Sequence, residues 1–443
     1  CHNEYRDVWT KHQFHMKTIP NKEFKIDLKD SAIGTKIYKQ QYHLNDEKRL
    51  VLTYHAMNNV KNGLYKPNEH SIHNVPIIVI KRKDGRMRLA YDLTKLNKYT
   101  KDIQSHLPSY NYLFEKMRGK GYNTVTDLKN FFENIKTREK DQDLVTVTTP
   151  IGRFKLTHAT YGFKNVATIA QEISEELIAP LKTACAFIDD IFIKHEEEAT
   201  EEELYAKAEA LLKRARDMGV LLHPEKTFFF VEEVEFLGYV FSKDGHKPRK
   251  EYIKKVLEIP KPKTVKQIQA YLGLIQYIAR YVHKLAEWSR YLTILTKKDS
   301  KEKWGEAQDI AFNEIQQRVK HVKMLYHPTL HDPFLVQTDA SKYAIAGVLY
   351  QKQWNRQNGT RQWRIIEFYS KQIDPHLIKH PIMVKECLAI AYALNHWKHF
   401  LLRQKFFLDT DHKNLISLYD DDETKAPEMR KKPIFHTLRD ATA

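Results

Sequence analysis

Two adjacent carboxylates interrupt an apolar, β-prone run near the middle of the chain, Ala186-Phe187-Ile188-Asp189-Asp190-Ile191-Phe192-Ile193. Burying these aspartates without partners would destabilise the folded chain, or it would raise their pKa until they took up protons. A tight turn between two buried strands avoids that cost, because both carboxylates then project into a cleft. They repel one another there unless a cation lies between them, and Mg²⁺ prefers one or two carboxylates plus phosphate oxygens. An ordinary hairpin with an acidic turn is the alternative reading of this pattern.

A second apolar run, Tyr122-Asn123-Thr124-Val125-Thr126-Asp127-Leu128, carries one more acid. A two-metal site for phosphoryl transfer needs carboxylates from separate strands, which hold the ions about 3.5–4 Å apart. One ion lowers the pKa of the attacking hydroxyl, and the other steadies the leaving group. Asp127, Asp189 and Asp190 are therefore candidates for one site of this kind.

Three further acids lie in the last quarter of the chain. Asp339 follows an apolar strand, Glu386 lies on an amphipathic helix, and Asp411 follows another strand. Acids from a strand, a helix and a strand end can converge on two metal ions in a fold that combines a sheet with helices. Each acid taken alone is more often a surface charge, and Asp409 is expected to be structural or exposed.

The elements that must position these acids are indicated by periodicity and turn residues. Asp84-Gly85 between two β-prone runs predicts a hairpin with five basic residues near its tip. The other expected elements are a hairpin over 145–156, helices over 167–181 and 199–218, a helical region over 264–322, strands within 334–369, a helix over 382–400 and a strand at 406–408. The first seventy residues give few signals.

Length and composition narrow the class of protein. The chain has 443 residues, too many for one ordinary core, and 42% are hydrophobic and 29% charged, as in globular proteins. No apolar run reaches the length of a membrane span, and no secretory pattern opens the chain. Cys1, Cys185 and Cys387 are far apart, which predicts neither a zinc site nor a disulfide framework and favours a reducing compartment.

The formal net charge is +17, from 73 basic and 56 acidic residues. A surplus of this size favours a polyanionic partner such as nucleic acid, although a merely basic soluble protein is the alternative. The surplus is spread along the chain, which predicts basic grooves in folded domains. The chain starts at Cys1 rather than Met, as a piece of a longer precursor would.

On these residues the chain resembles reverse transcriptases of long-terminal-repeat retroelements, most of all the gypsy-type group (Metaviridae). Phe187-Ile188-Asp189-Asp190 resembles the family's YxDD box, with Phe in place of Tyr, and Asp127-Leu128 resembles its LDL motif. The resemblance implies that Asp127 and Asp189 are direct metal ligands and that Asp190 completes the acidic triad. It also implies two Mg²⁺ or Mn²⁺ ions in each active site.

The resemblance extends to a nucleotide pocket. The segment 82–88 resembles the fingers motif KKDGxxR, which implies that Lys83 and Arg88 hold the incoming triphosphate. Tyr161-Gly162-Phe163-Lys164-Asn165 and Gln171 resemble FGLxNAPxxFQ, which shapes the nucleotide and template pocket. Thr160, Val166 and Ala167 depart from that motif, because the family has Pro, Ala and Pro at these positions.

Four more features of the family have counterparts here. Phe132 lies five residues after Asp127, where relatives carry an aromatic residue that excludes a 2′-hydroxyl. Lys226 matches a lysine thought to protonate the leaving pyrophosphate. Phe236, Leu237 and Gly238 resemble the primer-gripping FLGYxIS hairpin, and the segments 259–264 and 271–282 resemble motifs of the thumb. A core aromatic residue and a surface lysine are the alternatives for Phe132 and Lys226.

The last three acids resemble the TDAS, KELLAI and TDHxxL motifs of retroelement RNase H. The resemblance implies that Asp339, Glu386 and Asp411 bind metal and that the domain hydrolyses RNA in RNA–DNA hybrids. Relatives carry a fourth acid on a late helix, but only 32 residues follow Asp411 (443 − 411 = 32), and none fits that pattern. We therefore expect a domain that stops short of its fourth ligand and cleaves weakly.

Together these observations predict an α+β protein, a right-hand polymerase followed by an RNase H-like α/β domain. We expect fingers and palm over 1–240, a thumb over 241–322 and the RNase H-like domain over 323–443. The expected function is RNA- and DNA-directed DNA polymerisation with RNase H activity, and the alternative is a non-catalytic subunit or domesticated nucleic-acid-binding protein.

The expected partners are an RNA template, a DNA primer, RNA–DNA hybrid and dNTPs, without a membrane. A homodimer or heterodimer is left open. The expected location is the cytoplasm, within virus-like particles, with later access to the nucleus. A caulimovirus or retrovirus source would imply the same chemistry.

Overall fold

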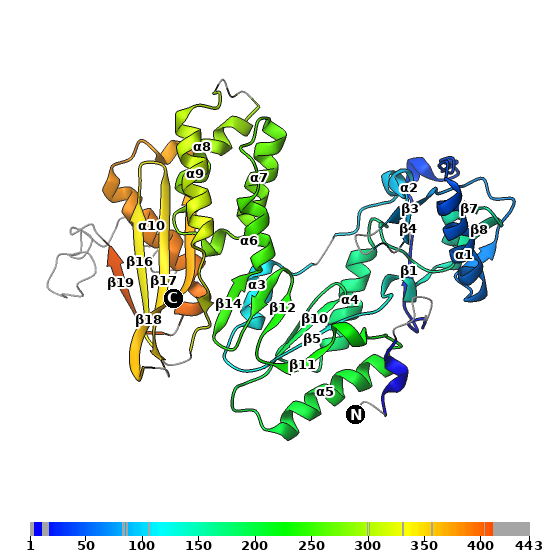
Figure 1. The fold of residues 1–443 in the computed structure, drawn as a ribbon, viewed down its shortest axis with the longest axis horizontal. Coiled ribbons are helices and arrows are strands. Elements are labelled where there is room, and N and C mark those ends of the chain that lie inside the picture. The colour runs from blue at the N-terminus through cyan, green and yellow to red at the C-terminus, as the bar shows by residue number, and fades with distance from the viewer. Residues whose placement is uncertain are drawn as a thin grey trace. The chain divides into compact units, whose positions relative to one another are not determined.

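The computed structural model describes residues 4–10, 17–81, 85, 87–104, 107–298, 300, 302–329, 332–355, 358–402 and 404–410. The chain forms two compact units (Figure 1). The first unit comprises Cys1–Met117 and Gly121–Val234, and the second comprises Arg118–Lys120 and Glu235–Ala443. The division at residue 234 lies near the expected end of the palm, whereas the expected thumb and RNase H-like domain fall in one unit.

The amino-terminal half of the first unit combines short strands with helices. The hairpins predicted over 75–91 and 145–156 are confirmed, and their strands pair in antiparallel register. The elements are β1 (Glu23–Phe24), α1 (Asp46–Lys61), β2 (Tyr65–Pro67), β3 (Ile77–Lys81), β4 (Met87–Tyr91), α2 (Thr94–Tyr99), α3 (Tyr110–Met117), β6 (Lys136–Thr137), β7 (Thr146–Thr149) and β8 (Gly152–Leu156).

A four-stranded sheet in the order β11-β5-β10-β9 forms the other part of the first unit. Its strands are β5 (Asn123–Asp127), β9 (Ala184–Phe187), β10 (Asp190–Lys194) and β11 (Phe228–Val231), accompanied by α4 (Val166–Ile178) and α5 (Glu201–Asp217). The two helices lie close to the predicted ranges. The acidic run before α5 contributes its first turn, where Thr200 and Glu203 form a capping box and the carboxylates favour the positive end of the helix dipole.

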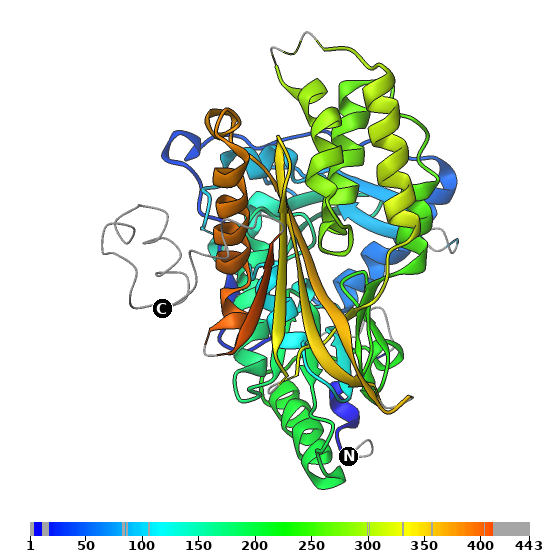
Figure 2. The ribbon, with the colours of Figure 1, turned by 90° about the vertical axis from the view of Figure 1, so that its left-hand side faces the viewer.

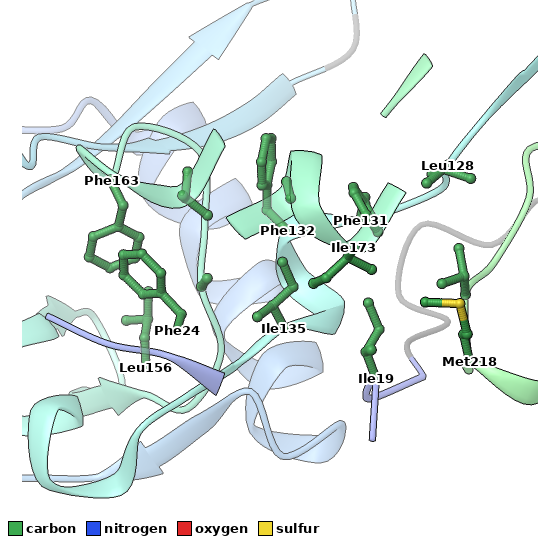
Figure 3. Close-up of a cluster of buried hydrophobic side chains, with 14 of the residues drawn as sticks. Ile19, Phe24, Leu128, Phe131, Phe132, Ile135, Leu156, Phe163, Ile173 and Met218 are labelled. Carbon is green, nitrogen blue, oxygen red and sulfur yellow. The ribbon is translucent and has the colours of Figure 1, made fainter. Parts of the chain in front are cut away.

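One apolar core spans this unit and joins the sheet to the amino-terminal half. Phe24 packs against Phe163 with ring centroids 4.7 Å apart, although the two residues are far apart in sequence. Figure 3 shows these rings near Leu156 and Ile135, and Phe131 and Phe132 near Ile173 of α4. Because Phe131 and Phe132 follow Asp127 by only a few residues, the core fixes the segment that follows β5.

The second unit begins with a small antiparallel sheet and a set of helices. The sheet order is β12-β13-β14-β15. The elements are β12 (Val234–Phe236), β13 (Tyr239–Phe241), β14 (Gly245–Pro248), β15 (Leu325–Tyr326), α6 (Lys250–Leu257), α7 (Val265–Tyr277), α8 (Leu285–Thr293) and α9 (Glu306–Lys320). The helical region expected over 264–322 is therefore confirmed as α7, α8 and α9 with short 3₁₀ turns between them.

A larger sheet in the order β18-β17-β16-β19 completes the second unit. Strands β16 (Phe334–Ala340), β17 (Ala344–Asn355) and β18 (Thr360–Gln372) are antiparallel, and β19 (Phe406–Thr410) pairs with β16 in parallel. Helix α10 (Ile382–His396) packs Ile390, Ala393 and Leu394 against one face, and α11 (Lys398–Leu401) follows it. Figure 2 shows α10 on one side of this sheet and the helices α7–α9 on the other.

Helix α1 is the main element that the sequence reasoning did not find. Its exposed face carries Leu50, Tyr54 and Met57, so apolar residues do not mark a single buried stripe. Asn45 caps its first turn by accepting from the Lys48 N–H at 3.0 Å. Among the described helices, none has the length and apolarity needed to cross a membrane.

Buried neutral histidines make the stability of this fold depend on pH. The His195 side chain, only 1% exposed, contacts the Thr124 hydroxyl at 2.9 Å, and burial lowers the pKa of His195 to about 4. In the unfolded chain the pKa is near 6.5, so the contribution of neutral His195 is present above that pH and is lost as the pH falls toward 4. At about pH 5 the loss is about 2 kcal/mol.

We therefore expect the free energy of unfolding to fall between about pH 7 and about pH 5, and to fall less steeply in His195→Gln. The measurement is chemical denaturation of both proteins at a series of pH values. The slope is the readout, because the substitution also changes stability at neutral pH. Parallel pH dependences in the two proteins would contradict this origin.

Candidate active site

The three acids predicted to act together lie side by side at one end of the first unit's sheet. Asp127 is the last residue of β5, and Asp190, the first residue of β10, lies directly opposite in the antiparallel register. Asp189 occupies the turn before β10, and its carbonyl accepts from the Leu128 N–H at 2.8 Å. The predicted turn between two buried strands is therefore confirmed, and carboxylates from separate strands are brought together.

The turn is held in an unusual backbone conformation by two side chains from α4. Ile188 has φ +59°, the left-handed region that β-branched residues rarely adopt. Gln171 accepts from the Ile188 N–H at 2.7 Å and donates to the Ala186 carbonyl at 3.0 Å. The Ser174 hydroxyl donates to the Ile188 carbonyl. Both main-chain groups of Ile188 are thus fixed by the helix below.

Burial and neighbouring negative charge disfavour the ionisation of Asp189 and Asp190. Burial, followed by the charges of Asp189 and Asp127, raises the pKa of Asp190 to about 6. Burial and the neighbouring Asp127 also raise the pKa of Asp189. The Lys226 ammonium, which lies 2.7 Å from Asp127 Oδ1, supplies one positive charge. The site therefore gains stability from any further cation placed between these oxygens.

The oxygen donors fit a hard divalent cation. Mg²⁺ is held through one or two carboxylates together with water and phosphate oxygens, rather than by a closed cage of side chains. Within the described ranges, no three acidic, histidine or cysteine side chains are grouped closely enough to form a metal cluster by themselves. Asp127, Asp189 and Asp190 are thus the residues that could hold such ions.

A cavity of about 370 Å³ opens beside the three acids. Arg88 lines it with its guanidinium 5.2 Å from the centre of the Tyr161 ring, so a cation and an aromatic ring lie together in the wall. Sequence reasoning missed two charged residues that also line this cavity, Lys129 and Glu133. Burial raises the pKa of Glu133 to about 7, although Arg88 and Lys129 oppose that shift.

The residues predicted to bind the nucleotide fall into four groups. Arg88, Tyr161 and Lys226 line the cavity. Phe132 is 6% exposed and meets the Tyr161 ring edge-on with centroids 4.6 Å apart, so it lies beneath the lining. Gln171 is 2% exposed and supports the turn at Ile188, a positioning role that the motif alone did not indicate. Lys83 lies outside the described residues.

The departure from the family motif at Val166-Ala167 leaves the helix intact. Helix α4 starts at Val166, so Ala167 stands in its first turn, where a proline presets φ but is not required for helix formation. Asn165 instead fixes the preceding segment, since its side-chain amide donates to the Lys101 carbonyl at 2.9 Å and accepts from the Ile103 N–H at 3.3 Å.

The predicted primer-grip residues form the tight turn between β12 and β13 in the second unit. Leu237 and Gly238 both have positive φ, +46° and +78°, as a two-residue hairpin turn requires. A Cβ on Gly238 would lie 2.3 Å from the Tyr277 hydroxyl, which donates to the Leu237 carbonyl. The turn therefore needs glycine for both its conformation and its packing. Phe236 is buried at the end of β12.

Two of the three acids predicted for the RNase H-like site are among the residues that the structure describes. Asp339 is on β16, and Glu386 of α10, which is 2% exposed, accepts from the N–H of the next residue, Ala340, at 3.1 Å. The Glu386 carboxylate is therefore bonded to the main chain of the residue that follows Asp339, at the carboxyl end of β16. Asp411 lies outside the described residues. Asp409 is exposed and accepts from Gln337 at 3.0 Å, in agreement with the expectation for it.

Comparison with protein families assigns two segments of the chain. Residues 80–241 match the model of the reverse transcriptase (RNA-dependent DNA polymerase) family. Residues 304–408 match the RNase H-like domain found in reverse transcriptases. This chain contains a reverse transcriptase domain and an RNase H-like domain. The first match includes all three aspartates of the palm, and the second includes Asp339 and Glu386 and begins before residue 323, the expected start of that domain.

Related proteins agree with the resemblance seen in the motifs. The Tf2-3 and Tf2-7 transposon polyproteins of Schizosaccharomyces pombe are each 27% identical over 424 residues, which is 95% of this chain and 31% of theirs. The chain thus spans about a third of the length of these relatives. The resemblance to the polyproteins of long-terminal-repeat retrotransposons is confirmed.

Solved structures support the fold. A foamy viral protease–reverse transcriptase dRH in complex with double-stranded DNA gives a TM-score of 0.79 at 20% identity, covering 99% of this chain and 75% of that one. The foamy viral protease–reverse transcriptase in complex with an RNA/DNA hybrid gives 0.71 at 20% identity, covering 100% and 59%. The expected fold class, a right-hand polymerase followed by an RNase H-like domain, is confirmed.

The support that Gln171 gives to the reverse transcriptase turn can be tested through stability. In Gln171→Met the Ile188 N–H and the Ala186 carbonyl lose a buried partner while the side-chain volume is largely kept. We expect a loss of about 2–4 kcal/mol in the free energy of unfolding, measured by chemical denaturation. Glu175→Gln is the matched control on the same helix, because its exposed side chain accepts only the second Gln171 N–H. A loss below about 1 kcal/mol in Gln171→Met would contradict this role.

Proposed function

We propose that this chain catalyses RNA- and DNA-directed DNA synthesis, with Asp127, Asp189 and Asp190 as the catalytic acids. The observation that carries the proposal is the placement of Asp127 opposite Asp190, with Asp189 in the adjoining turn, beside a cavity lined by Arg88 and Lys226. Negative charge beside a basic cavity suits a reaction in which divalent ions join carboxylates to a triphosphate. The match to the reverse transcriptase family supports the same activity.

The chemistry that bound divalent ions would supply is activation of the primer 3′-hydroxyl and stabilisation of the leaving pyrophosphate. Asp127, Asp189 and Asp190 would hold these ions, and Gln171 and Ser174 would keep the carboxylates in place through the turn. Arg88 orients the triphosphate from the cavity wall. Lys226 lies next to Asp127, where its ammonium can neutralise or protonate the pyrophosphate as it leaves.

The proposed substrates and location follow from charge and relatives. The net charge of +17 suits an RNA template, a DNA primer and RNA–DNA hybrid, with dNTPs as the monomers. Phe236, Leu237 and Gly238 would contact the primer strand, and Lys83 would join Arg88 on the triphosphate. A location in cytoplasmic virus-like particles accords with the retrotransposon relatives. The intact acidic triad favours an enzyme over a non-catalytic subunit.

We propose a second activity, hydrolysis of RNA in RNA–DNA hybrids, for the RNase H-like domain. The acids that would hold divalent ions there are Asp339, Glu386, which is bonded to the main chain of the residue after Asp339, and Asp411. Carboxylate oxygens suit Mg²⁺ or Mn²⁺. Bound ions would activate water and stabilise the departing oxygen of the phosphodiester.

Replacing Asp189 by Asn tests the polymerase directly. The substitution keeps the volume but removes a charged ligand, so primer extension on RNA and DNA templates should fall by at least about a thousandfold. Template–primer affinity should change little, because it comes from basic grooves. Asp217→Asn, at the exposed end of α5, is the matched control and should extend primers normally. Substantial extension by folded Asp189→Asn with either Mg²⁺ or Mn²⁺ would refute the assignment.

Phe132 is proposed to exclude ribonucleotides through its contact with Tyr161 at the cavity floor. Phe132→Val should lower the preference for dNTPs over rNTPs, measured as the ratio of kcat/KM values, by about tenfold to a hundredfold. Phe131→Val is the matched control, because it removes a neighbouring aromatic from the same core at 0% exposure. Both variants should lose stability, but only Phe132→Val should lose discrimination. An unchanged ratio in Phe132→Val, or an equal change in both variants, would contradict the role.

A further inference from the structure

A lysine from the helical part of the second unit contacts the RNase H-like carboxylate. The Lys284 ammonium forms an ion pair with Asp339, and the two side chains are 32% and 39% exposed. Lys284 lies just before α8, and Asp339 lies on β16, 55 positions later in the chain (339 − 284 = 55). The sequence gives no indication of this pair, because no motif links the segment around Lys284 with the segment around Asp339.

Contacts with strand β18 and helix α9 hold the segment around Lys284 in place. Lys284 has φ +53°, a left-handed conformation that is uncommon for lysine. On either side of it, the Ala286 N–H donates to the Ser370 hydroxyl at 3.1 Å, and the His283 ring lies 5.4 Å from the Phe368 ring. The Arg318 guanidinium donates to the His283 carbonyl at 3.2 Å. Strand β18 and helix α9 therefore hold the lysine where it meets Asp339.

The pair faces a cavity rather than a closed interface. A space of about 310 Å³ is lined by Lys284 and His283 on one side and by β16, β17 and the end of β19 on the other. Asp339 and Asp409 both line this cavity. Asp409 accepts a hydrogen bond from Gln337, whereas Asp339 forms its ion pair with Lys284. Figures 1 and 2 both place α8 next to β17 and β18 of this sheet. An ion bound to Asp339 in this space would therefore lie beside the Lys284 ammonium.

A lysine ammonium and a divalent cation compete for the same carboxylate. Both are attracted by its charge, and a cation bound at Asp339 would lie close to Lys284 and be repelled by it. A site intended only to bind metal gains nothing from a fixed lysine on its ligand. Lysine is also a flexible point charge that pairs equally well with phosphate, so a nucleic-acid backbone offers it another partner.

We propose that Lys284 is an internal competitor for divalent metal at Asp339, and that the phosphate backbone of a bound hybrid draws it away. This inference rests on the proposed RNase H function and adds its regulation. Without hybrid, Lys284 keeps Asp339 neutralised and the site binds metal weakly. With hybrid, the ammonium exchanges the carboxylate for a phosphate, so metal binding and substrate binding favour each other.

The test measures Mn²⁺ binding to the whole chain by electron paramagnetic resonance. The background variant carries Asp127→Asn, Asp189→Asn and Asp190→Asn, which remove the carboxylates of the proposed polymerase site. In this background Lys284→Ala should bind Mn²⁺ about three- to tenfold more tightly, the range expected for a partly exposed ion pair. Adding Asp339→Asn should abolish the gain. Lys284→Arg keeps the charge and should bind as weakly as the parent. Lys342→Ala, which removes the same charge beside the Tyr343 ring, should also leave affinity unchanged.

A second arm adds an RNA–DNA hybrid of fixed length. Hybrid should tighten Mn²⁺ binding in the parent, and this gain should be smaller in Lys284→Ala, where the competitor is already absent. Equal Mn²⁺ affinity with and without Lys284 would overturn the inference while leaving the RNase H assignment in place, provided that Asp339→Asn still weakens binding. If Asp339→Asn alters neither Mn²⁺ binding nor hybrid cleavage, both the assignment and the inference fail.

Discussion

Repulsion among Asp127, Asp189 and Asp190 is the constraint on which the rest of the first unit depends. Burial, together with the charge of Asp127, raises the pKa of both Asp189 and Asp190. Holding them together requires a rigid support, and the antiparallel register of β5 and β10 supplies it. The support continues below the sheet through α4 and along the segment after β5, where Phe131 and Phe132 are anchored in the core.

The sequence was sufficient for the features that depend on local pattern. The Asp-Asp pair within a β-prone run predicted the turn, Asp84-Gly85 predicted the hairpin of β3 and β4, and helical spacing predicted α4. Helix α1 was not predicted, because Leu50, Tyr54 and Met57 are exposed and its apolar residues do not mark a buried face. The order of the motifs, rather than any one of them, predicted the combination of a polymerase with an RNase H-like domain.

What could not be read from the sequence depends on contacts between distant segments. Gln171 was expected in the nucleotide pocket, but its amide faces the turn at Ile188, which only the packing of α4 under the sheet determines. Lys129 and Glu133 line the cavity without belonging to a recognised motif. Each of the two candidate sites also has a lysine on one carboxylate, Lys226 on Asp127 and Lys284 on Asp339. Since a lysine can pair with a phosphate as readily as with a carboxylate, both are suited to exchanging partners when substrate arrives.

The left-handed conformation of Ile188 places a steric cost in the fold itself. A β-branched residue in this conformation is costly, and it persists because both of its main-chain groups are bonded to α4. Folding of the first unit therefore offsets that cost before any ligand binds. In the proposed polymerase reaction the acidic turn would not need to be reshaped when nucleotide binds, so binding energy from the triphosphate would remain available to align the reacting atoms.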